Sequence, residues 1–101
     1  MKNSTTCVAT ATYLDHEVAK DLQDRLSRTA GQVEGIKRML EEHRDCETIL
    51  TQLAAARAAL NRITARLVEN HMETCVADAV RHGAGREALA RLKGALGLVL
   101  R

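Results

Sequence analysis

The chain has 101 residues, a length typical of one domain, and its 46% apolar and 28% charged content is that of a globular protein. It contains no proline, phenylalanine or tryptophan and a single tyrosine, Tyr13, whereas good helix formers are abundant. This composition excludes a β-sandwich and an aromatic core, argues against base stacking on single-stranded nucleic acid, and predicts an all-α fold. The net charge of +2 is too small to identify a polyanionic partner.

No apolar run reaches the roughly 20 residues of a membrane span, and residues 1–13 lack the apolar centre of a signal peptide. We therefore expect a cytoplasmic protein with no membrane partner. In that compartment the three cysteines, Cys7, Cys46 and Cys75, are better explained as ligands or reactive thiols than as a disulfide framework.

Residues 1–14 are rich in small side chains without periodicity, which predicts a flexible N-terminal arm followed by one all-α domain over residues 15–101. Helical periodicity begins after Asp15, a candidate N-cap. An apolar series with alternating steps of four and three residues predicts a helix to about residue 43 with a coiled-coil seam. The series is Leu22, Leu26, Thr29, Val33, Ile36 and Leu40.

A second candidate N-cap, Asp45, precedes a long central helix predicted for residues 46–81. This helix would span about 54 Å, and one short partner helix cannot cover such a rod, so we expect an obligate oligomer. After a turn at residues 82–85, a short third helix loosened by Gly94 and Gly97 is expected. Two heptad rows interleave on the central helix, namely Ile49, Ala56 and Ile63, and Leu53, Leu60 and Leu67.

Two candidate metal ligands, His71 and Cys75, are spaced one helical turn apart on the central helix. Alone, the pair fits equally well a surface histidine beside a small buried cysteine. Cys46 begins the same helix, about 37 Å from His71 along the axis, and so cannot complete a site within its own chain. In an antiparallel pair of chains, however, Cys46 of one chain would meet His71 and Cys75 of the other, and two-fold symmetry would create two such sites.

Two thiolates and one imidazole are a soft donor set, which favours Cu(I), Zn(II) or related ions over Mg²⁺ or Ca²⁺. A structural zinc site would need a fourth ligand, and none is evident beside this trio, so the donor set favours three-coordinate Cu(I). Cys7 and His16 are candidate extra ligands, although each is more simply explained as a solvated side chain of the N-terminal region.

Arginines form a stripe between Glu47 and Glu69, a stretch without acidic residues. The stripe fits solubility or intersubunit ion pairs as well as contacts with nucleic-acid phosphates, for which guanidinium geometry is well suited. In an oligomer, symmetry would multiply the stripe into a phosphate-binding face. The arginines are Arg57, Arg62 and Arg66, with Arg25 and Arg28 one turn apart on the first helix.

The sequence resembles a known protein family over about residues 18–100, and four segments carry the resemblance. They are residues 25–36 (RLSRTAGQVEGI), 45–46 (DC), 49–55 (ILTQLAA) and 70–75 (NHMETC). Together they resemble the copper-sensitive operon repressor family of small all-α bacterial transcription regulators. The resemblance implies three-helix chains paired into an antiparallel dimer with a four-helix-bundle core, and two such dimers in a tetramer. It also implies operator DNA binding by the metal-free form and release on Cu(I) binding at Cys46, His71 and Cys75.

Arg25 and Arg62 match positions that resemble DNA contacts in copper-sensing members, and with Arg28 and Arg66 they form the predicted DNA-binding set. The chain departs from the family at two other positions. Copper sensors typically carry a tyrosine before the first cysteine and a glutamate in the third helix, where this chain has Asp45 and Arg91. These two side chains could form an ion pair that links the metal ligands to the third helix.

The nearest alternative is a nickel or cobalt sensor of the same family that recruits His16 or the N-terminal arm, with square-planar Ni(II). Formaldehyde or persulfide sensing fits the Cys, His, Cys pattern less well. A thiol redox enzyme is disfavoured because the sequence has no Cys-x-x-Cys motif, so we expect no enzymatic activity. A cytoplasmic copper buffer is a further alternative, but it would not explain the arginine stripe.

Overall fold

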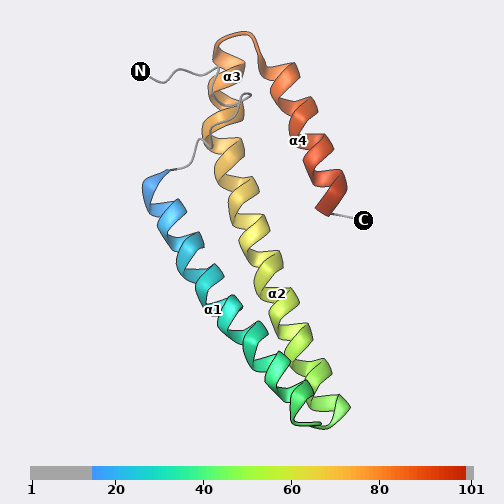
Figure 1. Cartoon of the computed structure of the whole chain (residues 1–101). Coiled ribbons are helices and arrows are strands. Elements are labelled where there is room, and N and C mark those ends of the chain that lie inside the picture. Colours follow the sequence, from blue (N-terminus) through green and yellow to red (C-terminus); the bar gives the residue numbers. More distant parts are fainter. Residues whose placement is uncertain (1–14, 100–101) are drawn as a thin grey trace. The chain divides into compact units, whose positions relative to one another are not determined.

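The computed structural model describes residues 15–99, which contain helices and turns but no strand. The elements are α1 (His16–Glu41), α2 (Cys46–His71), the π-helical segment η2 (Met72–Val76), α3 (Ala77–Arg81) and α4 (Gly85–Val99) (Figure 1). The predicted all-α fold is confirmed, with helix ends close to those expected. The predicted arm, residues 1–14, lies outside the described residues.

The chain divides into two compact units. The hairpin unit is Glu17–Leu67, in which α1 and most of α2 run antiparallel (Figure 1). The C-terminal unit comprises residues 68–99 together with Asp15 and His16. The boundary falls inside α2, so each unit contains part of that helix.

In the hairpin unit, α1 packs against α2 through one heptad row on each helix. The alternate seam residues Leu22, Thr29 and Ile36 are buried on α1, and they face a buried row on α2. Val18 and Leu22 cluster with Ile63, and Ile36 clusters with Ile49 and Ala56. The other rows remain 39–59% exposed: Leu26, Val33 and Leu40 on α1, and Leu53, Leu60 and Leu67 on α2.

Helices α1 and α3 end in the same way. After α1, the Arg44 amide donates to Met39 O (3.0 Å) and the His43 amide to Leu40 O (3.2 Å), with His43 in the left-handed region (φ 57°). After α3, the equivalent left-handed position is Gly83 (φ 80°). These are Schellman ends, which satisfy the last helical carbonyls. Glycine at position 83 signalled its turn in the sequence, whereas His43 occupies the same conformation without that signal.

The C-terminal unit packs α4 against η2 and α3 through small side chains. Val76, Ala79 and Ala88 form its buried cluster, with Ala84 and Leu92 packed on it. At the turn into α4, a Cβ atom on Gly85 would lie 2.6 Å from Val80 Cγ2 and 3.2 Å from Val80 Cα. Gly85 is therefore required by the close approach of the two helices. Further along, α4 continues through Gly94 and Gly97 to Val99.

We expect Gly85→Ala to destabilise the protein by about 1–3 kcal/mol, because the added methyl group overlaps Val80. Gly94→Ala is the matched control, since a Cβ atom on Gly94 would have no neighbouring atom within 4 Å. It should stabilise the protein by about 0.5–1 kcal/mol through helix propensity. Denaturant unfolding of the metal-free protein measures both, and equal effects of the two substitutions would contradict the close approach at Gly85.

Candidate metal centre and basic pocket

The predicted ligands His71 and Cys75 lie where α2 passes into the π-helical segment. His71 is the last residue of α2 and is half-buried, whereas Cys75 lies within η2 and is fully buried. The backbone N–H of Ala77 donates to Met72 O, five residues earlier, which is the π-helical pattern. The two predicted ligands are thus separated by a wider turn than the expected α-helical one. Such π turns occur frequently at functional sites.

Asn70, next to His71, is a buried polar residue that the sequence reasoning missed. It is 4% exposed, its side-chain Oδ1 accepts the Asp15 backbone N–H at 3.4 Å, and its carbonyl oxygen accepts the Thr74 hydroxyl at 2.8 Å. These bonds connect the beginning of α1 to the helical turn that carries both ligands. A sequence signal existed, because Asn70 continues by sevens the buried row that contains Ala56 and Ile63.

The two cysteines of the predicted trio differ in oxidation state. Cys46, the first residue of α2, is exposed and has a free thiol. Cys75 is disulfide-bonded in the structure. The thiolate is the form that binds metals, so Cys75 can act as a ligand only after reduction.

Among residues 15–99, no three His, Cys, Asp or Glu side chains gather around a point that could hold a metal ion. Cys46, His71 and Cys75 are therefore not gathered around one point in the part of the chain that the structure describes, and a site shared between two chains stays a prediction. His16, a candidate extra ligand, is exposed at the first position of α1. Cys7, the other candidate, lies outside the described residues.

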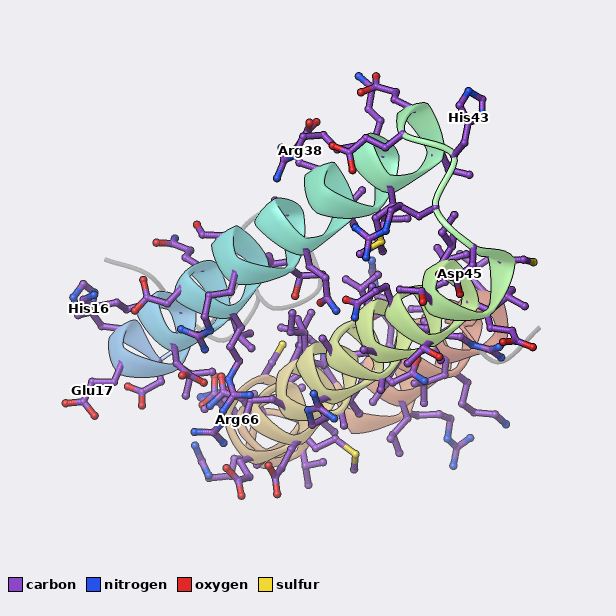
Figure 2. All side chains as sticks on the ribbon, turned by 90° about the horizontal axis from the view of Figure 1, so that it is seen from below. His16, Glu17, Arg38, His43, Asp45 and Arg66 are labelled. Carbon is purple, nitrogen blue, oxygen red and sulfur yellow. The ribbon has the colours of Figure 1, made fainter. Side chains whose placement is uncertain are left out.

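Asp45 is the N-cap of α2, as predicted. Its carboxylate accepts the Thr48 backbone N–H at 2.9 Å and the Thr48 hydroxyl at 2.8 Å. The hydroxyl bond, followed by the backbone bond, lowers the pKa of Asp45 from its ordinary value. Figure 2 shows His43 and Asp45 at the connection between α1 and α2. Arg91 on α4 donates instead to Glu87 Oε2 at 3.3 Å, so an ion pair between Asp45 and Arg91 remains a prediction.

We expect Asp45→Ala to lower the thermal midpoint of the metal-free protein, because the Thr48 amide loses its acceptor. Asp45→Asn should retain most of the stability, since asparagine caps helices about as well as aspartate. Thermal unfolding followed by circular dichroism compares the two variants. An equal loss in both would show that the charge matters rather than the cap, as an ion pair with Arg91 requires.

Three of the four predicted DNA-binding arginines line one pocket between α1 and α2 in the hairpin unit. The cavity has a volume of about 190 Å³. Arg25 Nε donates to Asp21 Oδ2 at 2.9 Å, which holds that guanidinium in place. Arg66, the fourth, lies on α2 but does not line the pocket (Figure 2). The lining residues are Arg25, Arg28, Thr29, Gln32, Ala59 and Arg62.

The family model described as "Metal-sensitive transcriptional repressor" matches residues 18–97, most of the chain. The chain belongs to this family. The family resemblance inferred from the sequence is confirmed: this protein is a metal-sensing transcriptional repressor, which implies DNA binding.

Curated relatives of this repressor include the copper-sensing transcriptional repressor CsoR of Bacillus subtilis. The two are 40% identical over 82 residues, which cover 78% of this chain and 81% of the relative. The copper-sensing transcriptional repressor RicR of Mycobacterium tuberculosis is 44% identical over 59 residues, which cover 58% of this chain and 62% of the relative.

Two solved structures resemble this repressor along most of the chain. The copper-sensing repressor CsoR with Cu(I) from Geobacillus thermodenitrificans has a TM-score of 0.84 at 35% identity, covering 91% of this chain and 96% of that one. The nickel-responsive transcriptional regulator InrS has a TM-score of 0.68 at 40% identity, covering 77% and 88%. Among the described helices of this repressor, none combines the length and apolarity needed to cross a membrane.

Proposed function

We propose that this repressor responds to Cu(I): the metal-free form binds operator DNA, and the form with Cu(I) bound by Cys46, His71 and Cys75 releases it. The observation that carries the proposal is the donor set. Two thiolates and one imidazole are soft ligands that suit Cu(I), and without a fourth ligand they suit a structural zinc ion poorly. The similarity to a solved copper sensor with Cu(I) supports the same metal.

Each site would take Cys46 from one chain and His71 and Cys75 from the partner. Exposed apolar rows on the hairpin unit support such pairing. Leu53, Leu60 and Leu67 are 39–48% exposed along one side of α2, and a monomer gains nothing by presenting such a row to water. A second copy would bury it and would set the two long helices antiparallel, as the predicted four-helix-bundle core requires.

Metal binding can cause release from DNA only if the conformation that has left the DNA binds Cu(I) more tightly than the DNA-bound conformation does. Bound Cu(I) would supply a covalent bridge between two chains. Cys46 sits at the beginning of α2 and His71 at its end, so joining them across the dimer fixes how the two α2 helices meet. His71 keeps a second ring nitrogen for a hydrogen bond, through which the state of the site can reach neighbouring residues.

We expect reduced, metal-free protein to bind its own promoter DNA, and stoichiometric Cu(I) to weaken that binding by roughly 5- to 150-fold. Cys46→Ser and Cys75→Ser should keep DNA binding but lose the response. Cys7→Ser is the matched control and should respond normally. Fluorescence anisotropy under anaerobic, reducing conditions measures these affinities. Absence of DNA binding by the metal-free protein at low salt would refute repression.

Mixing two defective variants tests whether the site lies between chains. In a dimer of one Cys46→Ser chain and one Cys75→Ser chain, one of the two sites regains all three ligands. We expect an equimolar mixture, refolded together, to bind roughly a quarter of the Cu(I) that the wild type binds. Each variant alone is the control. A mixture that binds no more Cu(I) than the separate variants would place the three ligands within one chain.

The second candidate is a nickel-responsive repressor, which the similarity to InrS favours. That function would need ligands beyond the trio, with His16 or Cys7 as candidates. The promoter titration separates the two: release by Ni(II) but not by Cu(I) would replace copper with nickel. A copper buffer, the candidate without a regulatory role, would bind Cu(I) and leave the DNA unbound throughout.

A further inference from the structure

Asn70 is the most deeply buried polar side chain in the part of the chain that the structure describes, at 4% exposure. It is the residue before His71, near the end of α2, and its Oδ1 accepts the backbone N–H of Asp15, 55 residues earlier. Thr29, the other buried polar residue, uses its hydroxyl within its own helix. A buried amide costs free energy unless it is hydrogen-bonded, so the bond to Asp15 is a specific link between two distant segments.

The Asp15 N–H needs an acceptor from outside α1. Asp15 directly precedes the first residue of α1, and in a capping box the N–H at that position is accepted by a Glu or Gln three residues later. Here the residue three positions later is Val18, which is apolar and buried. Asn70 supplies the missing acceptor from α2, and both bonded residues belong to the same compact unit.

Asn70 is also bonded into the turn that carries two predicted metal ligands. Asn70 directly precedes His71, Thr74 directly precedes Cys75, and the Thr74 hydroxyl donates to Asn70 O at 2.8 Å. This bond joins the two residues that stand before the ligands, across the passage from α2 into η2. A threonine hydroxyl bonded to the carbonyl four residues earlier often bends a helix, so the bond constrains the geometry of this turn.

We propose that Asn70 positions the metal ligands: it holds the turn at residues 71–75 against the start of α1, so that Cu(I) binding and the ordering of that start favour each other. The inference rests on the proposed function, which supplies the metal ion. Groups that orient metal ligands change metal affinity by about 10- to 100-fold when they are removed. Linkage is reciprocal, so whatever the Asn70 bond adds to Cu(I) affinity, bound Cu(I) returns to the bond.

The alternative is that Asn70 only stabilises the fold. In that case loss of its bond lowers the free energy of unfolding, yet the folded protein binds Cu(I) as before, and the start of α1 does not respond to the ion. A positioning role moves both quantities together. Cu(I) affinity and hydrogen exchange of the Asp15 amide therefore distinguish the two roles.

Asn70→Leu removes the acceptor with little change in volume, and Asn61→Leu is the matched control because it makes the same exchange at an exposed position of α2. We expect Asn70→Leu to weaken Cu(I) binding by about tenfold, measured anaerobically by competition with a chromogenic Cu(I) chelator. Asn61→Leu should leave the affinity unchanged. Asn70→Asp keeps an oxygen acceptor and should recover most of the lost affinity. Wild-type affinity in a folded Asn70→Leu protein would overturn the proposal.

Removing the donor tests the same bond from α1 and leaves the buried amide in place. Asp15→Pro has no backbone N–H, whereas Asp15→Ala keeps the N–H and loses only the side chain. We expect Asp15→Pro, and not Asp15→Ala, to weaken Cu(I) binding by about the same factor as Asn70→Leu. The double variant Asp15→Pro/Asn70→Leu should lose no more than either single variant, because both changes remove one bond. Losses that multiply would show that the two residues act separately, and the proposal fails.

Hydrogen exchange followed by NMR supplies a readout that does not depend on copper. In metal-free protein, the Asp15 amide should exchange faster in Asn70→Leu than in the wild type, since it has lost its acceptor. Cu(I) should slow this exchange in the wild type but not in Asn70→Leu. A wild type that binds no Cu(I) refutes the proposed function and this proposal with it. A wild type that binds Cu(I) with unchanged exchange at Asp15 overturns this proposal alone.

Discussion

The packing of α1 against α2 uses one heptad row on each helix and leaves a second row on each helix in water. Burial of Leu22, Ile36 and Ile63 removes apolar surface from solvent, and this drives the hairpin to form. The buried row also fixes the rotation of each helix about its axis. Every other face of α1 and α2, including the exposed apolar rows and the arginine face, takes its direction from that rotation.

The basic pocket follows from the same packing. Thr29 belongs to the buried row of α1, yet it ends in a hydroxyl that bonds back to Arg25 O. Ala59 lines the pocket from α2 with a single methyl group. Where two short side chains meet, helices held apart by larger neighbours leave a cavity between them.

Features that depend on local periodicity or chemistry were predictable from the sequence. The heptad series located α1 and α2, Asp45 marked the start of α2, and Gly83 marked the turn after α3. These signals require only the residues concerned and their neighbours along the helix.

Features that depend on backbone register or on facing helices were not predictable. The series from Leu22 to Leu40 was expected to form one seam, but it divides into a buried row, which packs on α2 within the hairpin unit, and an exposed row. The central helix was expected to be uniformly α-helical to residue 81, and no proline or glycine announces the π turn at Met72–Val76. The pocket could not be predicted either, because the sequence does not show which residues of α2 face Arg28 on α1.

The exposed leucine rows have a thermodynamic consequence. Where a second copy buries them, part of the free energy that holds the hairpin together comes from association, and folding is linked to protein concentration by mass action. The melting temperature of such a chain rises as it is concentrated. A dilute chain loses stability and pairing together, and with pairing it loses any site to which two chains must contribute.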